Sequence, residues 1–395
     1  MPSQHDPSAE QRLQQIQRAR VAVFDNEDES PRALRSLGEI AASGLLSMRP
    51  DSEWIERSWR RCLAQGQRPQ HRVAFDVVTS QFVRRTQDAQ HQLLQAARPA
   101  LEGLGRATAS TRYFAMLTDA SGVVVDVSGA IDTTDPRAVA IARVGVDLSE
   151  RSIGTSAISA ALSERRPVWL HRGEHFYRDT SVYSCAGAPV FGPSGECVGM
   201  LDLTGVEVAE RPELQHLVAR AARNIENALT LRAPHRLLIR LNWPGQLGNG
   251  DGNGLLCLDE DGCVTGANQV ARQIVSGLAS GRGPLHSDEL FAMPVQRLFD
   301  AAMRGRSGNG MLEVPLWSGL RVQVQAQIEG PGATADVTGM SRQRAVGHAV
   351  PLKDVELALV HQAVAEARGN VAQAARALGI SRATVYRKLG QKQGR

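Results

Sequence analysis

The stretch GNVAQAARALGISRATVYRKL, residues 369–389, has the spacing of two short helices joined by a tight turn. Gly369 followed by Asn370 predicts the end of one helix and the cap of the next, because Gly readily adopts left-handed backbone angles and Asn accepts hydrogen bonds from free amides. Gly379 interrupts the helical residues, and Ser381 predicts the cap of a second helix. The stretch therefore predicts a helix-turn-helix.

The polar side chains of this predicted motif indicate what it contacts. Its apolar residues can pack on one another, which leaves the polar residues of the second helix facing outward. A recognition helix uses such side chains on base edges and phosphates. The residues predicted to contact DNA are Asn370, Ser381, Arg382, Thr384, Tyr386, Arg387 and Lys388.

The charge of the chain is concentrated in the same place. Residues 351–395 carry eight Lys or Arg and three Asp or Glu, whereas the whole chain has a formal net charge of +4, so residues 1–350 together are close to neutral. A local basic excess is typical of nucleic-acid binding, and it disfavours the alternative of a plain two-helix cap on a larger domain.

The stretch 369–389 resembles the C-terminal domain of the Fis-type family, as found at the end of bacterial enhancer-binding regulators. The resemblance covers about 40 residues and assigns an all-α helix-turn-helix domain to residues 351–395. It implies a dimeric domain that places residues 381–388 in the major groove of double-stranded DNA.

Composition limits the remaining possibilities. A chain of 395 residues is long enough for two or three domains. It has no run of 18 apolar residues and a polar N-terminus, so we predict no membrane span, no signal peptide and a cytoplasmic location. No two of the five cysteines form a C-x-x-C pair, which favours free thiols. They are Cys62, Cys185, Cys197, Cys257 and Cys263.

Lysine is unusually scarce. The only lysines are Lys353, Lys388 and Lys392. A P-loop needs a lysine that reaches the β- and γ-phosphates, and none is present before residue 353. We therefore expect no P-loop ATPase domain in front of the DNA-binding domain.

The N-terminal part of the chain is predicted to be helical after a polar extension. Residues 1–49 are expected to be a disordered or helical extension, with disorder over 1–30. Residues 52–69 have Trp54 and Trp59 at helical spacing, which predicts an amphipathic helix that buries both rings. A second helical stretch is predicted over 80–104.

Two hairpins and a long helix follow. Residues 112–129 and 184–205 each read as two apolar strands around a turn, at Asp119–Gly122 and Gly192–Gly195. A long amphipathic helix is predicted over 210–232. Antiparallel strands flanked by helices predict an α+β sensor-like domain over residues 50–232.

This region resembles a GAF domain. Together with SWRRC (58–62) and GEHFYRDTSVYSCAGAPV (173–190), it is similar to the N-terminal half of the acetoin catabolism regulator family. The resemblance implies a sensor of a small metabolite or of a metabolic protein, and it implies no enzyme.

A third region, residues 250–330, resembles a PAS domain through LLCLDEDGCVTGAN (255–268), which reads strand, turn, strand and helix start. Two later strands are predicted around Ser318–Gly319. Members of the acetoin regulator family carry a sigma-54-engaging ATPase module before the DNA-binding domain. Here only a linker, 331–350, lies in that place. No cofactor is predicted for either sensor domain.

The loop HRGEHFYRDTSVYSC, residues 171–185, contains many polar and ionisable side chains. We weigh three interpretations: a surface loop whose aromatic rings pack on the sheet, a lid over an organic ligand, and a metal site. The spacing of His171 and His175 is H-x3-H without further ligands at zinc spacing, so no metal is predicted. The candidate ligand-binding residues are His175, Tyr177, Arg178, Asp179 and Cys185.

Two classes of function remain open at this stage. The first is a sequence-specific, ligand-responsive transcription regulator that works as a homodimer, with RNA polymerase as a further candidate partner. The second is an interaction or scaffold protein that binds nucleic acid without sequence preference. No arrangement of nucleophile and base supports an enzyme, and no membrane partner is expected.

Overall fold

A computed structural model describes residues 7–24, 53–75, 78–248, 250–279, 284–305 and 311–328, together with the single helical residue 371. The chain divides into two compact units, Met1–Ala333 and Thr334–Arg395, and the fold below is that of the first. Every predicted DNA contact lies outside the described residues: Asn370, Ser381, Arg382, Thr384, Tyr386, Arg387 and Lys388.

The first sheet has five antiparallel strands in the order β2-β1-β5-β4-β3. The strands are β1 (Tyr113–Asp119), β2 (Val124–Ser128), β3 (Val168–His171), β4 (Tyr183–Phe191) and β5 (Cys197–Val206). Both predicted hairpins are confirmed. The first turn forms because the Asp119 carboxylate accepts hydrogen bonds from the amides of Ser121 and Val123, and Gly122 adopts a φ of 91°.

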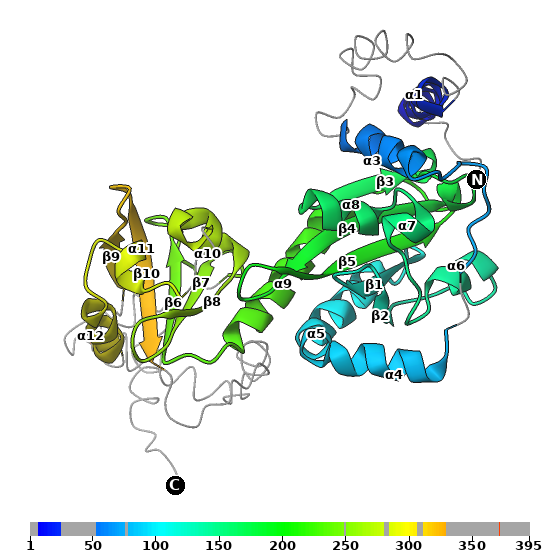
Figure 1. The fold of residues 1–395 in the computed structure, drawn as a ribbon. Helices are drawn as coiled ribbons and strands as arrows, with labels where there is room; N and C mark the ends of the chain where they lie inside the picture. The colour runs from blue at the N-terminus through cyan, green and yellow to red at the C-terminus, as the bar shows by residue number, and fades with distance from the viewer. Residues whose placement is uncertain are drawn as a thin grey trace. The chain divides into compact units, whose positions relative to one another are not determined.

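Helices cover both faces of this sheet (Figure 1). The predicted long helix is α9 (Leu214–Leu231), which packs with α5 (His91–Thr108) on one face. The other face is covered by α8 (Ala157–Glu164), which begins at the Ser156 cap, and by α3 (Glu53–Ala64). Alternate residues along β1 enter the two cores, since successive side chains of a strand point to opposite faces.

The helices before the sheet agree with the sequence pattern in part. Within α3, Trp54 and Trp59 are both buried as predicted. The helical stretch over 80–104 is two helices, α4 (Ser80–Ala89) and α5, which meet at Gln90. Two short helices, α6 (Pro136–Ile141) and α7 (Glu150–Ile153), follow β2.

The expectation of disorder over residues 1–30 is wrong for α1 (Pro7–Phe24), which lies beside α3 (Figure 1). Its sequence is polar, but Ile16 and Ala19 are buried in the core that contains Trp59. Arg20 adds three hydrogen bonds to carbonyls of the 171–182 loop. Tertiary contacts of a few residues therefore order a helix that composition alone does not favour.

The second sheet is also antiparallel, with the order β8-β7-β6-β10-β9. Its elements are β6 (Leu237–Asn242), β7 (Gly254–Leu258), β8 (Val264–Ala267), α10 (Gln269–Ile274), η4 (Ser276–Ala279), α11 (Ser287–Leu290), α12 (Gln296–Gly305), β9 (Met311–Pro315) and β10 (Arg321–Ile328). The predicted hairpins and the helix start at Asn268 are confirmed, and the Asn268 side chain caps α10 by accepting a hydrogen bond from Ala271 N. The central strand β6, which precedes residue 250, was not predicted.

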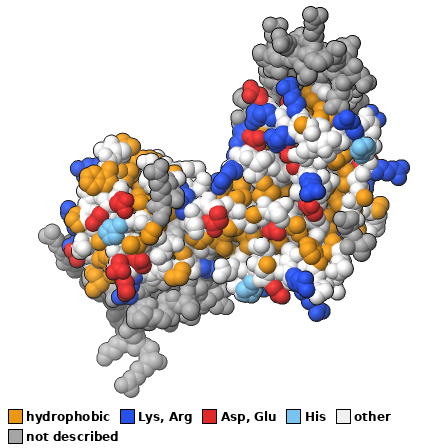
Figure 2. Space-filling view, viewed as in Figure 1, with side chains coloured by type: hydrophobic (Ala, Val, Ile, Leu, Met, Phe, Trp, Pro, Cys, Tyr) orange, Lys and Arg blue, Asp and Glu red, His pale blue; other side chains and the backbone are white. Residues whose placement is uncertain are grey.

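The surface of this unit is mixed in charge. On the face in Figure 2, basic and acidic side chains are interspersed, with apolar side chains between them. Within the described part of the chain, no helix combines the length and the apolar character that crossing a membrane requires.

Candidate ligand-binding site

The 171–182 loop crosses the face of the first sheet that α8 also covers. It contains two turns of 3-10 helix, η2 (Arg172–Glu174) and η3 (Asp179–Val182). Glu174 fixes its start, because its carboxylate accepts a 2.6 Å hydrogen bond from His171 N and pairs with Arg12 at 2.8 Å. Trp59 Nε1 donates to the Glu174 carbonyl at 2.9 Å. The loop is thus held by α1 and α3 as well as by the sheet.

An internal cavity of about 20 Å³ lies between this loop, α8 and the sheet. A cavity of this size has room for about one water molecule. Its wall is mainly apolar and includes a small set of polar side chains: Ser156, His175, Thr180, Tyr183, Cys185, Asp202 and Thr204.

His175 lines the cavity, and its imidazole carries a hydrogen-bond acceptor without a partner among the described residues. Its ring is 1% exposed, and its Nδ1 lies 2.9 Å from the carbonyl oxygen of Arg172. Because a carbonyl can only accept, Nδ1 carries the hydrogen. Burial lowers the pKa of His175 to about 4, so the ring is neutral near pH 7 and Nε2 has a free lone pair. Nε2 is buried and has no hydrogen-bond partner among the described residues.

Asp202 lies on the central strand β5 and is fully buried. Burial raises its pKa to about 7, with the hydrogen bond from Thr204 acting in the opposite direction. The Thr204 hydroxyl donates to Oδ2, whereas Oδ1 is buried and has no partner within the described chain. Cys185 Sγ lies 3.2 Å from Thr204 Oγ1, and burial raises the pKa of this thiol well above its ordinary value. Cys185 is therefore a neutral thiol.

The backbone explains why this acidic side chain is accommodated. Asp202 pairs across the sheet with Gly187 on β4. A Cβ on Gly187 would lie 2.8 Å from the Ala157 carbonyl, so only glycine lets the start of α8 approach the sheet this closely. Asp202 is consequently enclosed by α8 and the loop.

Two unsatisfied polar atoms, His175 Nε2 and Asp202 Oδ1, therefore belong to residues that line one mainly apolar cavity. Buried polar atoms are paired in folded proteins in the great majority of cases, because an unpaired one costs about 1–3 kcal/mol. Such a pair marks a place where a small polar molecule gains hydrogen bonds that the protein alone does not supply.

The structure separates the five predicted ligand residues into three groups. His175 and Cys185 line the cavity. Tyr177 is buried but packs edge-on against Phe176, with ring centroids 5.0 Å apart. Arg178 and Asp179 are exposed and do not line the cavity. Asp179 instead accepts a 3.1 Å hydrogen bond from Val73 N.

Sequence reasoning missed Asp202 and Thr204 on the central strand β5 and Tyr183 on the neighbouring strand β4. One signal was available: the run MLDLTG, residues 200–205, places an acidic residue in the middle of an apolar strand. Among the described residues, no group of three or more His, Cys, Asp or Glu side chains could hold a metal ion.

Comparison with known proteins relates these features to a family. Residues 351–391 match the family of bacterial regulatory proteins of the Fis type, and residues 38–227 match the family of MimR N-terminal domains. The acetoin catabolism regulatory protein of Cupriavidus necator is 30% identical over 233 residues, which are 58% of this chain and 35% of that protein. Over these 233 residues the chain is homologous to the acetoin catabolism regulatory protein.

A second such regulator, the acetoin dehydrogenase operon transcriptional activator AcoR of Bacillus subtilis, is 24% identical over 213 residues, 53% of this chain and 34% of the activator. This acetoin regulator homologue thus spans about a third of the length of the relatives that it matches. Among solved structures, the Escherichia coli DhaR(N)-DhaL complex matches 70% of this chain and 99% of that chain, at 15% identity and a TM-score of 0.41.

The homology supports a transcription regulator with a sensor-like α+β N-terminal region and a C-terminal Fis-family helix-turn-helix. In this homologue only residues 329–350 separate the end of β10 from the Fis-family match.

Proposed function

We propose that this acetoin regulator homologue is a ligand-responsive, sequence-specific DNA-binding transcription regulator. A GAF-like domain, residues 50–232, senses the effector, and a PAS-like domain, residues 250–330, relays the signal or dimerises. The Fis-type domain, residues 351–395, reads an inverted repeat as a homodimer. The observation that supports ligand sensing is the small cavity lined by two residues with unsatisfied polar atoms, His175 Nε2 and Asp202 Oδ1.

The chemistry of the cavity favours a small uncharged ligand. The neutral His175 ring offers an acceptor. A protonated Asp202, whose Oδ2 accepts from Thr204, offers a donor at Oδ1. A molecule with a hydroxyl group and a second oxygen matches both, and the apolar wall suits a short carbon chain. Burying an anion here would carry a large desolvation cost, because none of the described residues that line the cavity is a cation.

The present volume of about 20 Å³ implies that a ligand larger than water enters by displacing part of the wall. The 171–182 loop is the natural element to move, because connecting segments carry more freedom than the sheet they cover. Ligand binding and loop position are then coupled, which is what a sensor requires.

The test is calorimetric titration of the full chain with acetoin, acetone and ethylene glycol, together with footprinting on DNA upstream of its own gene. Acetoin is included because two relatives are named for its catabolism. We expect saturable binding of at least one neutral compound and a change in the footprint. Asp202→Leu, which removes the donor, should weaken that binding. Asp202→Asn, whose amide still donates and accepts, and Glu226→Gln, a buried carboxyl outside the cavity, should not. If no neutral compound binds, the sensing proposal fails.

We further propose that this regulator works without hydrolysing ATP, by recruiting or blocking RNA polymerase. The support is the absence of lysine before residue 353. ATP-dependent promoter opening by the purified chain alone would contradict this.

A further inference from the structure

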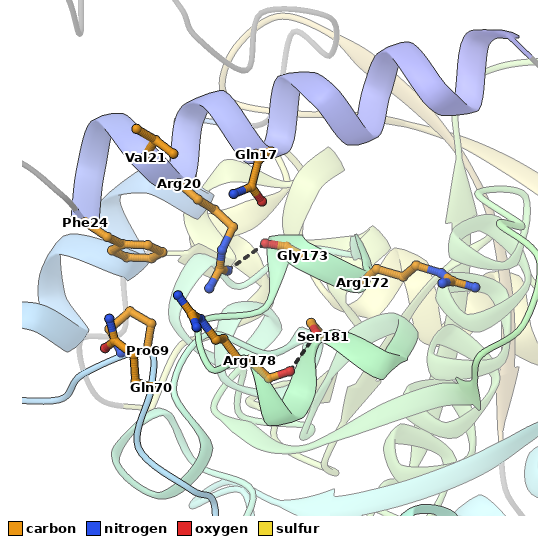
Figure 3. A pocket seen from close by; sticks show the side chains of 10 residues that line it. All are labelled: Gln17, Arg20, Val21, Phe24, Pro69, Gln70, Arg172, Gly173, Arg178 and Ser181. Carbon is orange, nitrogen blue, oxygen red and sulfur yellow. Dashed lines mark hydrogen bonds between the residues drawn. The ribbon is translucent and has the colours of Figure 1, made fainter.

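A second recess, of about 520 Å³, lies on the outer side of the 171–182 loop, where α1 crosses it (Figure 3). It shares no lining residue with the internal cavity. Its volume falls within the range of small-molecule sites. Its wall combines an apolar part, formed by Val21, Phe24 and Pro69, with two arginines whose charged groups face one another.

Arg20 is fixed in place by the main chain of the loop. Its Nη1 donates to the carbonyls of Gly173 and His175 at 2.8 and 2.6 Å, and its Nη2 donates to the carbonyl of Phe176 at 2.9 Å. Its Cζ lies 4.8 Å from the centroid of the Phe24 ring. A guanidinium has five N–H donors, so these three bonds leave donors free. All of its acceptors are neutral, and none of the ion pairs among the described residues includes it.

Arg178 approaches Arg20 from the opposite wall (Figure 3). Its main chain is fixed, since its amide donates to the Pro69 carbonyl at 2.9 Å and its carbonyl accepts from Ser181 Oγ at 2.6 Å. Its guanidinium is exposed and pairs with no side chain in the described part of the chain. Arg172 also lines the recess, but its guanidinium points away from the other two (Figure 3).

The two positive charges repel each other without compensation. Burial and the nearby Arg178 charge lower the pKa of Arg20 to about 10. None of the described residues that line the recess is an Asp or a Glu. Folded proteins commonly neutralise adjacent guanidinium groups with carboxylates, and here an open recess occupies that position.

We propose that Arg20 and Arg178 bind the oxyanion group of a small molecule, a carboxylate or a phosphate, that is seated in this recess. A planar guanidinium donates two aligned hydrogen bonds to such a group, and two guanidinium groups can hold it from both sides. Gln17 and Gln70 also line the recess and offer further amide donors, while Phe24 and Pro69 suit the carbon part of an organic acid. This site goes beyond the sensing cavity and does not rest on it.

The test is calorimetric titration of the full chain with inorganic phosphate and, separately, with acetate, at an ionic strength held constant with chloride. We expect saturable binding of at least one of them, and the arm that binds identifies the source of the oxyanion. Arg178→Gln should weaken this binding at least tenfold, and Arg178→Lys should weaken it less, since a charge remains.

Arg84→Gln is the matched control, because Arg84 is also exposed but lies on α4, away from the recess. The Arg84→Gln variant should bind the anion as tightly as the unaltered chain does. Gln70→Glu places a carboxylate on the wall of the recess and should reduce binding in the same way as Arg178→Gln. The proposal is overturned if neither anion binds saturably, or if Arg178→Gln binds as tightly as the unaltered chain.

Discussion

Arg20 donates a 2.6 Å hydrogen bond to the main-chain carbonyl of His175, while the imidazole of the same residue lines the internal cavity. The helix α1 and the cavity therefore act on one residue from opposite sides of the loop. Docking of α1 fixes the backbone of His175, and with it the position of the imidazole beside the cavity.

The first prediction concerns this contact. Arg20→Gln leaves carbonyls of Gly173, His175 and Phe176 without their charged donor, and we expect the free energy of unfolding to fall by about 2–3 kcal/mol. Urea denaturation of the full chain measures it, with Arg84→Gln as the control. An unchanged midpoint would show that α1 does not stay docked in solution.

The second prediction is a pH dependence from Asp202. Its pKa of about 7 in the folded state lies above its ordinary value of 3.8. Between these two pH values, the folded state therefore keeps a proton that the unfolded state has lost. Stability should therefore decrease as the pH rises from about 4 to about 7, and the loss should approach about 4 kcal/mol at higher pH.

Comparison of the unaltered chain with Asp202→Asn isolates this contribution. The difference between their free energies of unfolding should change across that window, whereas exposed Asp88→Asn should show no such change. His175, whose pKa is lowered, acts in the opposite direction below about pH 6.5, but it is present in both chains and cancels. If the difference in free energy of unfolding between the two chains stays constant from pH 4 to 7, the raised pKa of Asp202 is refuted.

The third prediction uses two glycines. Gly187→Ala should lower the free energy of unfolding by about 1–3 kcal/mol, because the added methyl meets the Ala157 carbonyl at 2.8 Å and Met200 at 2.5 Å. Gly103→Ala, in α5, meets no atom within 4 Å and should raise it by about 0.5–1 kcal/mol. Thermal unfolding of both variants is the measurement, and equal shifts in Tm would mean that α8 does not contact β4 as described.

The fourth prediction concerns DNA. Arg382→Ala and Arg387→Ala should each weaken specific binding by about 1–3 kcal/mol if their side chains reach guanines. Gel-shift titration at fixed salt, with specific and unrelated DNA, separates base contacts from phosphate contacts. Normal affinity in both variants would mean that the recognition helix is misassigned.

Turn and cap residues made much of the fold predictable. The Asp119–Gly122 and Gly192–Gly195 turns and the Asn268 cap are local signals, and the structure has an element boundary at each. The helix α1 could not be predicted, since its order depends on burial of Ile16 and Ala19 against distant segments. Asp202 and His175 line the same cavity only because of strand pairing and the absence of a side chain at Gly187, which are contacts between distant parts of the sequence. Arg178, a predicted ligand-binding residue, does not line the internal cavity but lines two recesses at the surface of the same region.

The hydrogen bonds from Arg20 to the 171–182 loop bear on which substitutions the cavity can tolerate. All three of its acceptors are main-chain carbonyls, which every amino acid provides. Substitutions at His175 can therefore alter what the cavity recognises while the attachment of α1 persists. If the cavity senses an effector as proposed, its preference can change through the side chain of residue 175 without loss of the hydrogen bonds that hold α1.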